Sequence, residues 1–323
     1  MNNGIIDPVN HKLTQNDLEA DNYKSFLDEL TDVPSSVPLK SFSINKAGIS
    51  GQMAYIKVRS LFSDQYVPVL CQIKMQVTLE GHRGIHMSRC EEALFALMQE
   101  EHDSLDELAS RLAMKLRNLQ SADAAFVEIE GTYIAERKTI KTRRTSHDRM
   151  TLFANAQATA TGIERQIGIA AFNMTGCPCT ETFTKFSVAP KLLETGLTLD
   201  QVNEILSITN SGTHTQRGQA KIMLDKPRDG VTYKMLYDIL DESCHLVFEL
   251  LKRADEHELV VRVLRKPQFT EDVVRDIIDV CIRKAGRYLE KESRIFASSV
   301  LFDSIHIHDV CTEIERSYGE LTA

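Results

Sequence analysis

The sequence lacks any apolar run of about 20 residues, the length that a membrane-spanning helix needs. Its first ten residues, Met1 to Asn10, also lack the apolar core of a secretory signal peptide. Basic residues are not in excess, because 38 Lys and Arg against 46 Asp and Glu give a net charge of −8. We therefore expect a cytoplasmic protein that binds neither membranes nor nucleic acid, although a locally basic pocket for a phosphorylated small molecule is compatible with this charge.

Cysteine is sparse and odd in number, with seven residues in a chain of 323. In a reducing compartment we expect mostly free thiols, with metal or redox roles for a few of them. Hydrophobic residues make up 42% of the chain, which is ordinary for a globular protein. The length suffices for one large core or two medium domains.

The hydrophobic period changes between that of a strand and that of a helix, in a similar order in each half of the chain. After a leader of residues 1–46, with a short helix at 16–30, the first half predicts strands at 53–60, 67–79, 124–135 and 150–158 and helices at 88–99 and 104–119. The second half predicts strands at 166–175, 218–224 and 294–304, helices at 231–252 and 270–287, and a helical insertion at 180–210. We therefore predict an α+β fold of two tandem modules, 47–160 and 161–323, each an antiparallel sheet with two helices packed on one face.

The segment Gly176-Cys177-Pro178-Cys179 is the first candidate for chemistry. One intervening residue is too few for the CxxC pairs of zinc ribbons. In an extended backbone, however, residues two apart point the same way, so both sulfurs could face one site at a strand end. The alternatives are a metal or catalytic site, two buried thiols, or one reactive pair.

A second candidate is the run from Asp303 to Asp309, which contains His306 and His308. If the preceding strand continues through it, Ile305 and Ile307 face the core and the two imidazoles share the other face. Two imidazoles beside carboxylates suit metal ligation or proton transfer. The alternative is a solvated strand end.

Four further segments carry weaker signals. The Gly-bounded turn 212–218 holds His214 and Arg217, which suit an anionic ligand, but an ordinary loop has the same composition. Segment 84–89 could hold phosphate at the start of a helix, or it could simply cap that helix. Ser88 is the expected N-cap of this helix and Ser104 that of the next one. Segment 242–245 lies within the expected helix at 231–252, so Glu242 and His245 share a face; the alternative is a single histidine on the exposed side. The basic run 138–144 is most simply a solvated loop, with phosphate contact as the alternative.

Together these segments resemble the GTP cyclohydrolases of type IB and their archaeal relatives of type IV. The resemblance runs from about Val67 to Val310, most of the chain, and its six segments stand in the family's order. They are Gly84-Ile-His-Met-Ser-Arg89, Met174-Thr-Gly-Cys-Pro-Cys179, Thr213-His-Thr-Gln-Arg-Gly218, Leu251-Lys-Arg-Ala-Asp-Glu256, Pro267-Gln-Phe-Thr-Glu-Asp-Val-Val-Arg275 and Ser304-Ile-His-Ile-His-Asp309. The insertion before His214 is similar to that of the archaeal branch.

The resemblance implies a tunnelling fold that forms a homo-oligomer, a dimer or tetramer with sites at subunit interfaces. It also implies one divalent metal per site, Fe2+, Mn2+ or Zn2+, with Cys177 and His306 as ligands and His214 at the reaction centre. Two positions depart from the family: Asp303 and His245 each stand where the family has Glu. Both could still ligate, which makes them candidate ligands. Where type IB enzymes anchor guanine with Glu, this chain has Val260.

The reaction that the resemblance implies is hydrolysis of GTP at C8 of the guanine ring. A metal-bound hydroxide attacks C8, His214 moves protons, and formate leaves. The product is a 7,8-dihydroneopterin phosphate for folate or pterin biosynthesis, either the triphosphate or the 2′,3′-cyclic phosphate. The alternatives are a related enzyme acting on another purine or pterin, and a non-catalytic paralogue. The expected substrate contacts are His86, Arg89, Gln216, Arg217 and His308.

Overall fold

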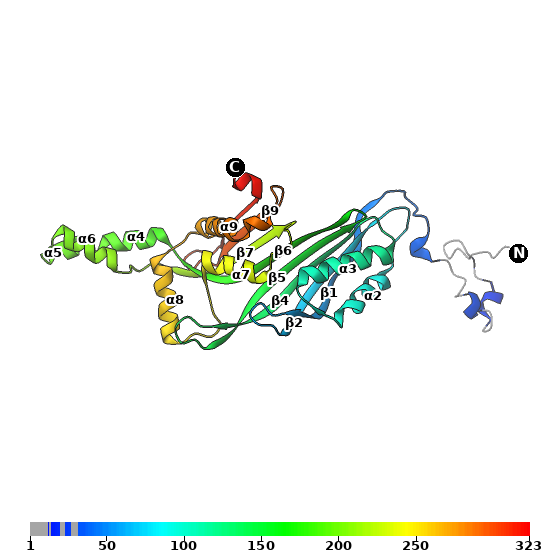
Figure 1. Ribbon diagram of the computed structural model, residues 1–323, viewed down its shortest axis with the longest axis horizontal. Coiled ribbons are helices and arrows are strands. Elements are labelled where there is room, and N and C mark those ends of the chain that lie inside the picture. Colours follow the sequence, from blue (N-terminus) through cyan, green and yellow to red (C-terminus); the bar gives the residue numbers. More distant parts are fainter. Residues whose placement is uncertain (1–11, 13, 20–22, 27–31) are drawn as a thin grey trace.

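A computed structural model describes residues 12, 14–19, 23–26 and 32–323 of the chain. Its strands join into one sheet with the order β10-β9-β7-β6-β5-β4-β2-β1-β3, and β8 pairs with β6 (Figure 1). Every pairing is antiparallel except that of β1 with β3. The strands are β1 (Ile44–Arg59), β2 (Tyr66–Leu79), β3 (Glu101–His102), β4 (Ala125–Lys138), β5 (Thr145–Thr159), β6 (Gly162–Gly176), β7 (Thr215–Asp225), β8 (His245–Leu246), β9 (Arg294–Leu301) and β10 (Val310–Ser317).

The first module consists of β1, β2, β4 and β5 with helices α2 (Met87–Met98) and α3 (Leu105–Gln120). Strand β2 buries every second residue, as its sequence pattern predicts. Helix α3 buries Leu105, Leu108, Leu112 and Leu116 against the sheet, and the predicted N-cap Ser104 accepts a hydrogen bond from the backbone of Glu107. The N-cap expected at Ser88 is wrong, because α2 begins one residue earlier and His86 occupies its N-cap.

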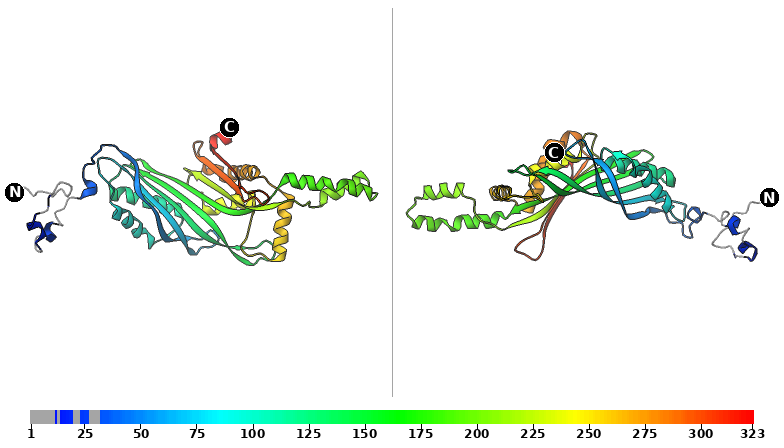
Figure 2. Two further views of the ribbon diagram at one scale, coloured as in Figure 1. Left: turned by 180° about the vertical axis from the view of Figure 1, so that it is seen from behind. Right: turned by 90° about the horizontal axis from the view of Figure 1, so that it is seen from below.

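The second module repeats this order with β6, β7, β9 and β10 and with helices α7 (Tyr233–Ser243) and α9 (Thr270–Ala285). One hydrophobic core runs beneath the helices of both modules. The helix pairs cover the same side of the sheet (Figures 1 and 2). The predicted α+β tunnelling fold, with two helices on one face of each half-sheet, is confirmed.

The single long helix predicted at 231–252 is wrong. Helix α7 ends at Ser243, β8 follows, and a separate helix α8 (Arg253–Arg265) precedes α9. The cause lies in the neighbouring strand: β5 pairs with β6 only as far as Ala171, which leaves the last residues of β6 without a partner on that side. Strand β8 takes this place by pairing Leu246 with Asn173 and His245 with Met174, which satisfies backbone groups that would otherwise lack hydrogen bonds.

The predicted insertion is a helical arm that extends beyond the sheet (Figure 2). It contains α4 (Pro178–Ser187), α5 (Ala189–Glu194) and α6 (Leu199–Ile208), and it exposes Phe183 and Ile208. Among the described residues, no helix has the length and apolarity to cross a membrane. The leader helix expected at 16–30 lies partly outside the described residues. Further short elements are η1 (Asn16–Leu18), η2 (Val33–Ser35), η3 (Gly286–Tyr288) and α10 (Tyr318–Leu321).

Candidate functional site

Three of the predicted segments meet where β6 ends, β7 begins and β9 ends. The β6–β7 ladder places Gly176 opposite Thr215, and it continues because the backbone N–H of Cys177 donates to the carbonyl of His214 at 3.1 Å. On the other side of β7, the N–H of Phe302 donates to the carbonyl of Arg217 at 2.9 Å. Segments far apart in the sequence therefore lie at adjacent strand ends.

Cys177 occupies the turn between a strand and a helix. It is the N-cap of α4, and Pro178 begins that helix, a position where its missing N–H costs no hydrogen bond. The hydroxyl of Thr180 donates to the Cys177 sulfur at 3.6 Å, and the hydroxyl of Thr213 donates to its carbonyl at 2.7 Å. The extended backbone expected through Cys179 is wrong, because Cys179 lies in the first helical turn. Cys177 is half-buried and Cys179 is exposed.

His214 is held by a short chain of side-chain hydrogen bonds. Its Nδ1 lies 3.0 Å from Oε1 of Gln216, and Nε2 of Gln216 donates to the hydroxyl of Thr175 at 3.0 Å. Because the Gln216 amide already uses its NH2 as the donor to Thr175, its oxygen accepts from Nδ1 of His214. This assigns the tautomer and leaves Nε2 of His214 able to accept a proton.

Thr175 was not among the predicted site residues. The sequence did contain a signal for it, because Thr175 precedes Cys177 by two residues and the backbone stays extended as far as Cys177, so both lie on the same face. Both Thr175 and its partner Gln216 are buried. The chain of hydrogen bonds to His214 is therefore shielded from water.

Arg217 belongs to the same segment as His214 but lies on the opposite face of the sheet. Strand alternation buries Gln216 and exposes Arg217. The Arg217 guanidinium lies over the rings of Phe172 and Phe302, at 5.8 and 6.0 Å from their centroids. Within one chain, Arg217 therefore does not share a pocket with the His214 side chain.

The strand predicted at 294–304 ends early, at Leu301. Oδ1 of Asp303 accepts hydrogen bonds from the backbone N–H groups of Ile305 and His306 at 2.7 and 3.0 Å, which turns the chain away from the sheet. The expectation that Ile305 and Ile307 face the core is wrong, since they are 62% and 106% exposed. The hydrogen bond from Ile305, together with those from His306, lowers the pKa of Asp303 to about 2.

Two of the predicted metal donors do lie together in this turn. Nδ1 of His306 is 3.3 Å from Oδ1 of Asp303. The rings of His306 and His308 stack with their centroids 5.2 Å apart. The turn thus gathers two imidazoles and a carboxylate, as the sequence predicts, but in an exposed loop.

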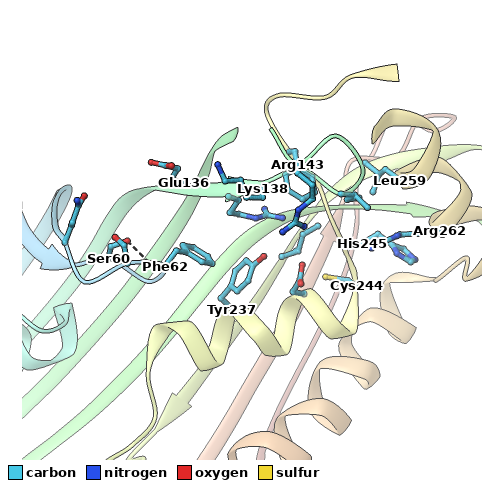
Figure 3. Close-up of a pocket in the computed structure, with 17 residues that line it drawn as sticks. Ser60, Phe62, Glu136, Lys138, Arg143, Tyr237, Cys244, His245, Leu259 and Arg262 are labelled. Carbon is cyan, nitrogen blue, oxygen red and sulfur yellow. Dashed lines mark hydrogen bonds between the residues drawn. The ribbon is translucent and has the colours of Figure 1, made fainter. Parts of the chain in front are cut away.

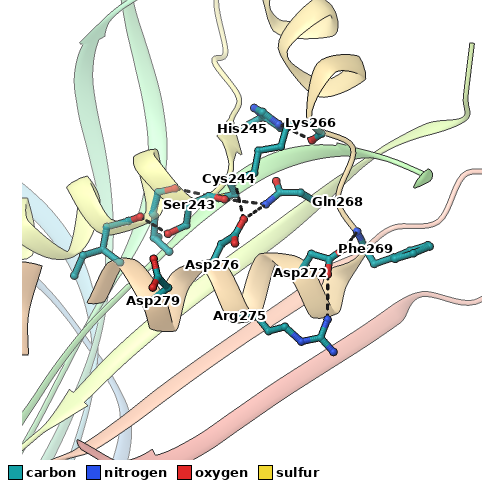
Figure 4. A network of polar contacts seen from close by, with 12 residues as sticks. Ser243, Cys244, His245, Lys266, Gln268, Phe269, Asp272, Arg275, Asp276 and Asp279 are labelled. Carbon is teal, nitrogen blue, oxygen red and sulfur yellow. Dashed lines mark hydrogen bonds and ion pairs between the residues drawn. The ribbon is translucent and has the colours of Figure 1, made fainter. Parts of the chain in front are cut away.

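His245 lies in β8, so it does not share a helix face with Glu242, and that expectation is wrong. Glu242 instead forms ion pairs with Arg283 and Lys284 of α9. The ring of His245 hydrogen-bonds the carbonyl of Lys266 at 3.1 Å, and burial lowers the pKa of His245 (Figure 4). His245 also lines a cavity of about 830 Å³ (Figure 3).

A buried polar network fixes the backbone next to His245 (Figure 4). The Gln268 side chain donates to the carbonyl of Ser243, the last residue of α7, at 3.0 Å and to Asp276 of α9 at 2.7 Å. Gln268 and Ser243 are both buried. These hydrogen bonds therefore connect the end of α7 to α9, and His245 lies two residues after Ser243.

The donor chemistry of the predicted metal ligands fits a divalent transition metal: a thiol at Cys177, imidazoles at His306 and His245, and a carboxylate at Asp303. Their positions are only partly assembled. Within the described part of the chain, no three His, Cys, Asp or Glu side chains converge as a metal site.

His86 and Arg89 lie at the far end of the sheet. They line a cavity of about 380 Å³ beside the start of α2, where the His86 ring hydrogen-bonds Asp32 at 2.6 Å. The strand ladders place this end at the start of β6, and Cys177 follows the end of β6. At about 3.3 Å per residue, the length of β6 separates the two places by roughly 45 Å.

Comparisons with known proteins agree with the resemblance seen in the sequence. The profile of the family described as type I GTP cyclohydrolase folE2 matches residues 30–312. The chain is 30% identical over 304 residues to the GTP cyclohydrolase MptA of Methanococcus aeolicus, covering 90% of this chain and 97% of that protein. It is 27% identical over 308 residues to the GTP cyclohydrolase MptA of Methanococcus vannielii, covering 91% and 98%. Among solved structures, the uricase from Arthrobacter globiformis matches with a TM-score of 0.44 at 8% identity, covering 88% of this chain and 96% of that one.

Proposed function

The chain belongs to the family of type I GTP cyclohydrolases, and from this membership we propose that it hydrolyses the imidazole ring of GTP at C8 and releases formate. The product is a 7,8-dihydroneopterin phosphate for folate or pterin biosynthesis. The observation that best supports this proposal is the hydrogen-bonded His214 beside Cys177 at the ends of β6 and β7. It provides a base of fixed tautomer next to a thiol.

His214 is the proposed proton carrier. Hydrolysis at C8 requires a proton to reach a ring nitrogen and the departing formyl group. Gln216 accepts from Nδ1 of His214, so Nε2 is the nitrogen that takes up and returns this proton. Thr175 holds the Gln216 amide in the orientation that this tautomer needs.

We propose one divalent metal per site, Fe2+, Mn2+ or Zn2+, with Cys177 and His306 as ligands and Asp303 and His245 as further candidates. A metal bound there would supply a water of lowered pKa as the nucleophile. The thiol and imidazoles favour transition metals over Mg2+. The chain positions these residues through the Thr180 hydroxyl at the Cys177 sulfur and the turn around Asp303.

The substrate contacts proposed from the sequence, His86, Arg89, Gln216, Arg217 and His308, are not gathered in one chain. We therefore propose a homo-oligomer, a dimer or tetramer, in which the α2 end of one subunit meets the Cys177 end of another. This arrangement would bring His86 and Arg89 to a site that one chain leaves incomplete.

A second candidate function is ring opening of another purine or a pterin. The observation that favours it is His245, which stands where the family has a glutamate. The imidazole of His245 hydrogen-bonds the carbonyl of Lys266. A neutral imidazole in place of a carboxylate changes the charge of the site by one unit and could alter the choice of substrate.

The test is to incubate the reduced protein anaerobically with GTP and with Fe2+, Mn2+ or Zn2+ in turn. We expect formate and, after oxidation, a fluorescent pterin. A phosphatase-resistant product identifies the cyclic phosphate, and a phosphatase-sensitive one the triphosphate. Neither formate nor pterin with any of the three metals would overturn the proposal.

The matched pair Cys177→Ala and Cys179→Ala tests the site assignment. We expect Cys177→Ala to lose bound metal and to lower turnover of GTP by about 100-fold or more. Cys179→Ala, which changes an exposed thiol two residues away, should retain both. A Cys177→Ala protein with full metal content and full turnover would refute the assignment.

A further inference from the structure

The cavity of about 830 Å³ beside His245 has a lining opposite in charge to the whole chain (Figure 3). The protein carries a net charge of −8. The cavity lining contains four cationic side chains, Arg137, Lys138, Arg143 and Arg262, against the two carboxylates Glu136 and Asp241. Its volume is in the range of sites that enclose a small-molecule ligand.

Two of these cations are already engaged by the protein. Arg137 is buried, forms an ion pair with Asp148 at 3.2 Å and lies 4.0 Å from the centroid of the Phe248 ring. Arg262 forms an ion pair with Glu258 at 3.0 Å. Both contribute to the wall of the cavity, and each has a carboxylate partner, although Glu258 also pairs with Lys141.

The other two cations have no such partner. Among the residues that the structure describes, neither Lys138 nor Arg143 has a carboxylate within ion-pair distance, and the Lys138 ammonium donates only to the hydroxyl of Thr145. Figure 3 shows both side chains at the cavity, from the end of β4 and from the loop that follows. Uncompensated cations at a cavity attract an anionic ligand.

Arg143 is held in an unfavourable backbone conformation. Its φ of 55° lies in the left-handed region, which residues with a Cβ seldom adopt. Such conformations persist where the surrounding structure imposes them, and they concentrate at binding sites.

The backbone of the loop before Arg143 is held by the buried carboxylate of Asp255, at the start of α8. It accepts hydrogen bonds from the backbone N–H groups of Lys141 and Thr142 at 2.8 and 2.9 Å and from the Thr142 hydroxyl at 2.6 Å. The loop is closed by a hydrogen bond from the N–H of Thr139 to the carbonyl of Arg144 at 2.9 Å. These contacts fix the loop immediately before Arg143.

We propose that this cavity binds the polyphosphate chain of the nucleotide substrate, with Arg143 and Lys138 as its contacts. This inference rests on the proposed function for the identity of the nucleotide. It places the phosphates at the basic run 138–144, for which the sequence favours a solvated loop, with phosphate contact as the alternative. Arg143 and Lys138 are then the phosphate contacts within one chain, in addition to those proposed for His86 and Arg89 from a second subunit.

The chain offers a matched control, because Arg144 lies in the same loop, carries the same charge and does not line the cavity. The experiment measures binding of inorganic triphosphate, GTP and guanosine to the purified oligomer by titration calorimetry. Arg143→Ala should bind triphosphate and GTP at least about tenfold more weakly, the usual effect of losing a charge-assisted hydrogen bond. Arg144→Ala should stay within about twofold of the unmodified protein. Guanosine binding should be the same in all three proteins.

Two further variants distinguish the loss of a phosphate contact from a folding defect. Arg143→Gly removes the side chain and relieves the left-handed backbone, and Lys138→Ala removes the second cation from the end of β4. Both should weaken triphosphate binding as Arg143→Ala does. Equal binding by the Arg143 and Arg144 variants, or no triphosphate binding by the unmodified protein, would overturn the inference.

The outcome is separable from that of the proposed function. Selective loss of triphosphate binding in the Arg143 variants, in a protein that makes no formate from GTP, would support the cavity and refute the cyclohydrolase reaction. Normal formate release together with equal triphosphate binding by both arginine variants would do the reverse.

Discussion

At the scale of single residues, the chain Thr175–Gln216–His214 decides which nitrogen of the histidine can act. A glutamine can present either its oxygen or its NH2 group to a neighbouring ring. In the structure the Thr175 hydroxyl accepts from the Gln216 NH2 group, and the amide oxygen faces His214. Thr175 is thus a positioning residue that acts through Gln216.

Replacing Thr175 by valine tests this role with little change in volume. We expect kcat for GTP to fall by about 10- to 100-fold with little change in KM, because the Gln216 amide loses its fixed orientation. Nitrogen-15 NMR of the ring should show a mixture of His214 tautomers. Thr175→Ser keeps the hydroxyl and should restore both the rate and the single tautomer. If Thr175→Val retained one tautomer and the full rate, the positioning role would be excluded.

Gly218 is a residue that the packing requires to lack a side chain. A Cβ there would lie 2.6 Å from a methyl group of Leu301, 2.7 Å from the carbonyl oxygen of Val300 and 3.0 Å from the amide oxygen of Asn173. We expect Gly218→Ala to lower the free energy of unfolding by about 1–3 kcal/mol, as overpacking does. Gly212→Ala, which meets open space, is the control. Similar thermal unfolding midpoints for the two variants would contradict this account.

At the scale of elements, helix α8 is connected to the loop between β4 and β5 through Asp255. Burial alone would raise the pKa of Asp255, but hydrogen bonds from Thr142, Lys141 and Lys252 outweigh it and hold the pKa well below its ordinary value of 3.8. A carboxyl group whose pKa is lowered by folding stabilises the folded protein at pH values above the pKa that the group has in the unfolded chain. That stabilisation is lost as the pH falls below 3.8 toward the folded pKa.

We therefore expect Asp255→Asn to lower the thermal midpoint at pH 7, on the order of 5 °C, because an amide offers one acceptor oxygen where the carboxylate offers two. The difference from the unmodified protein should shrink below pH 3.8 as the native carboxylate becomes protonated. Differential scanning calorimetry across this range measures it. A difference that grows as the pH falls would show that Asp255 does not act as an ionised acceptor.

The sequence predicts those helices and strands whose bounds depend on their own residues. It does not predict bounds that depend on contacts with a neighbouring element. Strand β2 and helix α3 carry complete apolar periods, and both were predicted within a few residues. The end of α7 depends on where β5 leaves β6, and the end of β9 depends on a turn made by Asp303. Both are tertiary or local polar effects that hydrophobic periodicity does not contain.

The candidate site shows the same division. The residue types and the motif order of the Cys177, His214 and His306 segments were sufficient to predict that they serve one function. Their adjacency follows from the β6–β7–β9 strand order, which the sequence alone did not contain. Thr175 lies in the motif around Cys177 and Arg143 in the basic run 138–144, but the part that each plays follows from its hydrogen-bond partners or backbone conformation.

At the scale of the whole molecule, the long continuous sheet keeps the two groups of proposed site residues apart. Cys177 and His214 lie beyond the end of β6, whereas His86 and Arg89 lie near its start. Strand β6 is paired with β7 on one side and with β5 and then β8 on the other along most of its length, so bending within the sheet would break these hydrogen bonds. A site that uses both groups must therefore be completed by a second copy of the chain.

Mixing two inactive variants tests this arrangement. Cys177→Ala disables one side of each site and Arg89→Ala the other. If each site combines the two sides from different subunits, co-expression in equal amounts with random assembly leaves about a quarter of the sites intact. We therefore expect GTP turnover near one quarter of the unmodified value in the mixture, against near zero for either variant alone. Differently tagged subunits allow the mixed oligomers to be purified, and a purified mixed dimer, in which one of the two sites is intact, should release formate at about half of the unmodified rate. Mixed oligomers as inactive as the single variants would show that Cys177 and Arg89 do not serve a shared interfacial site.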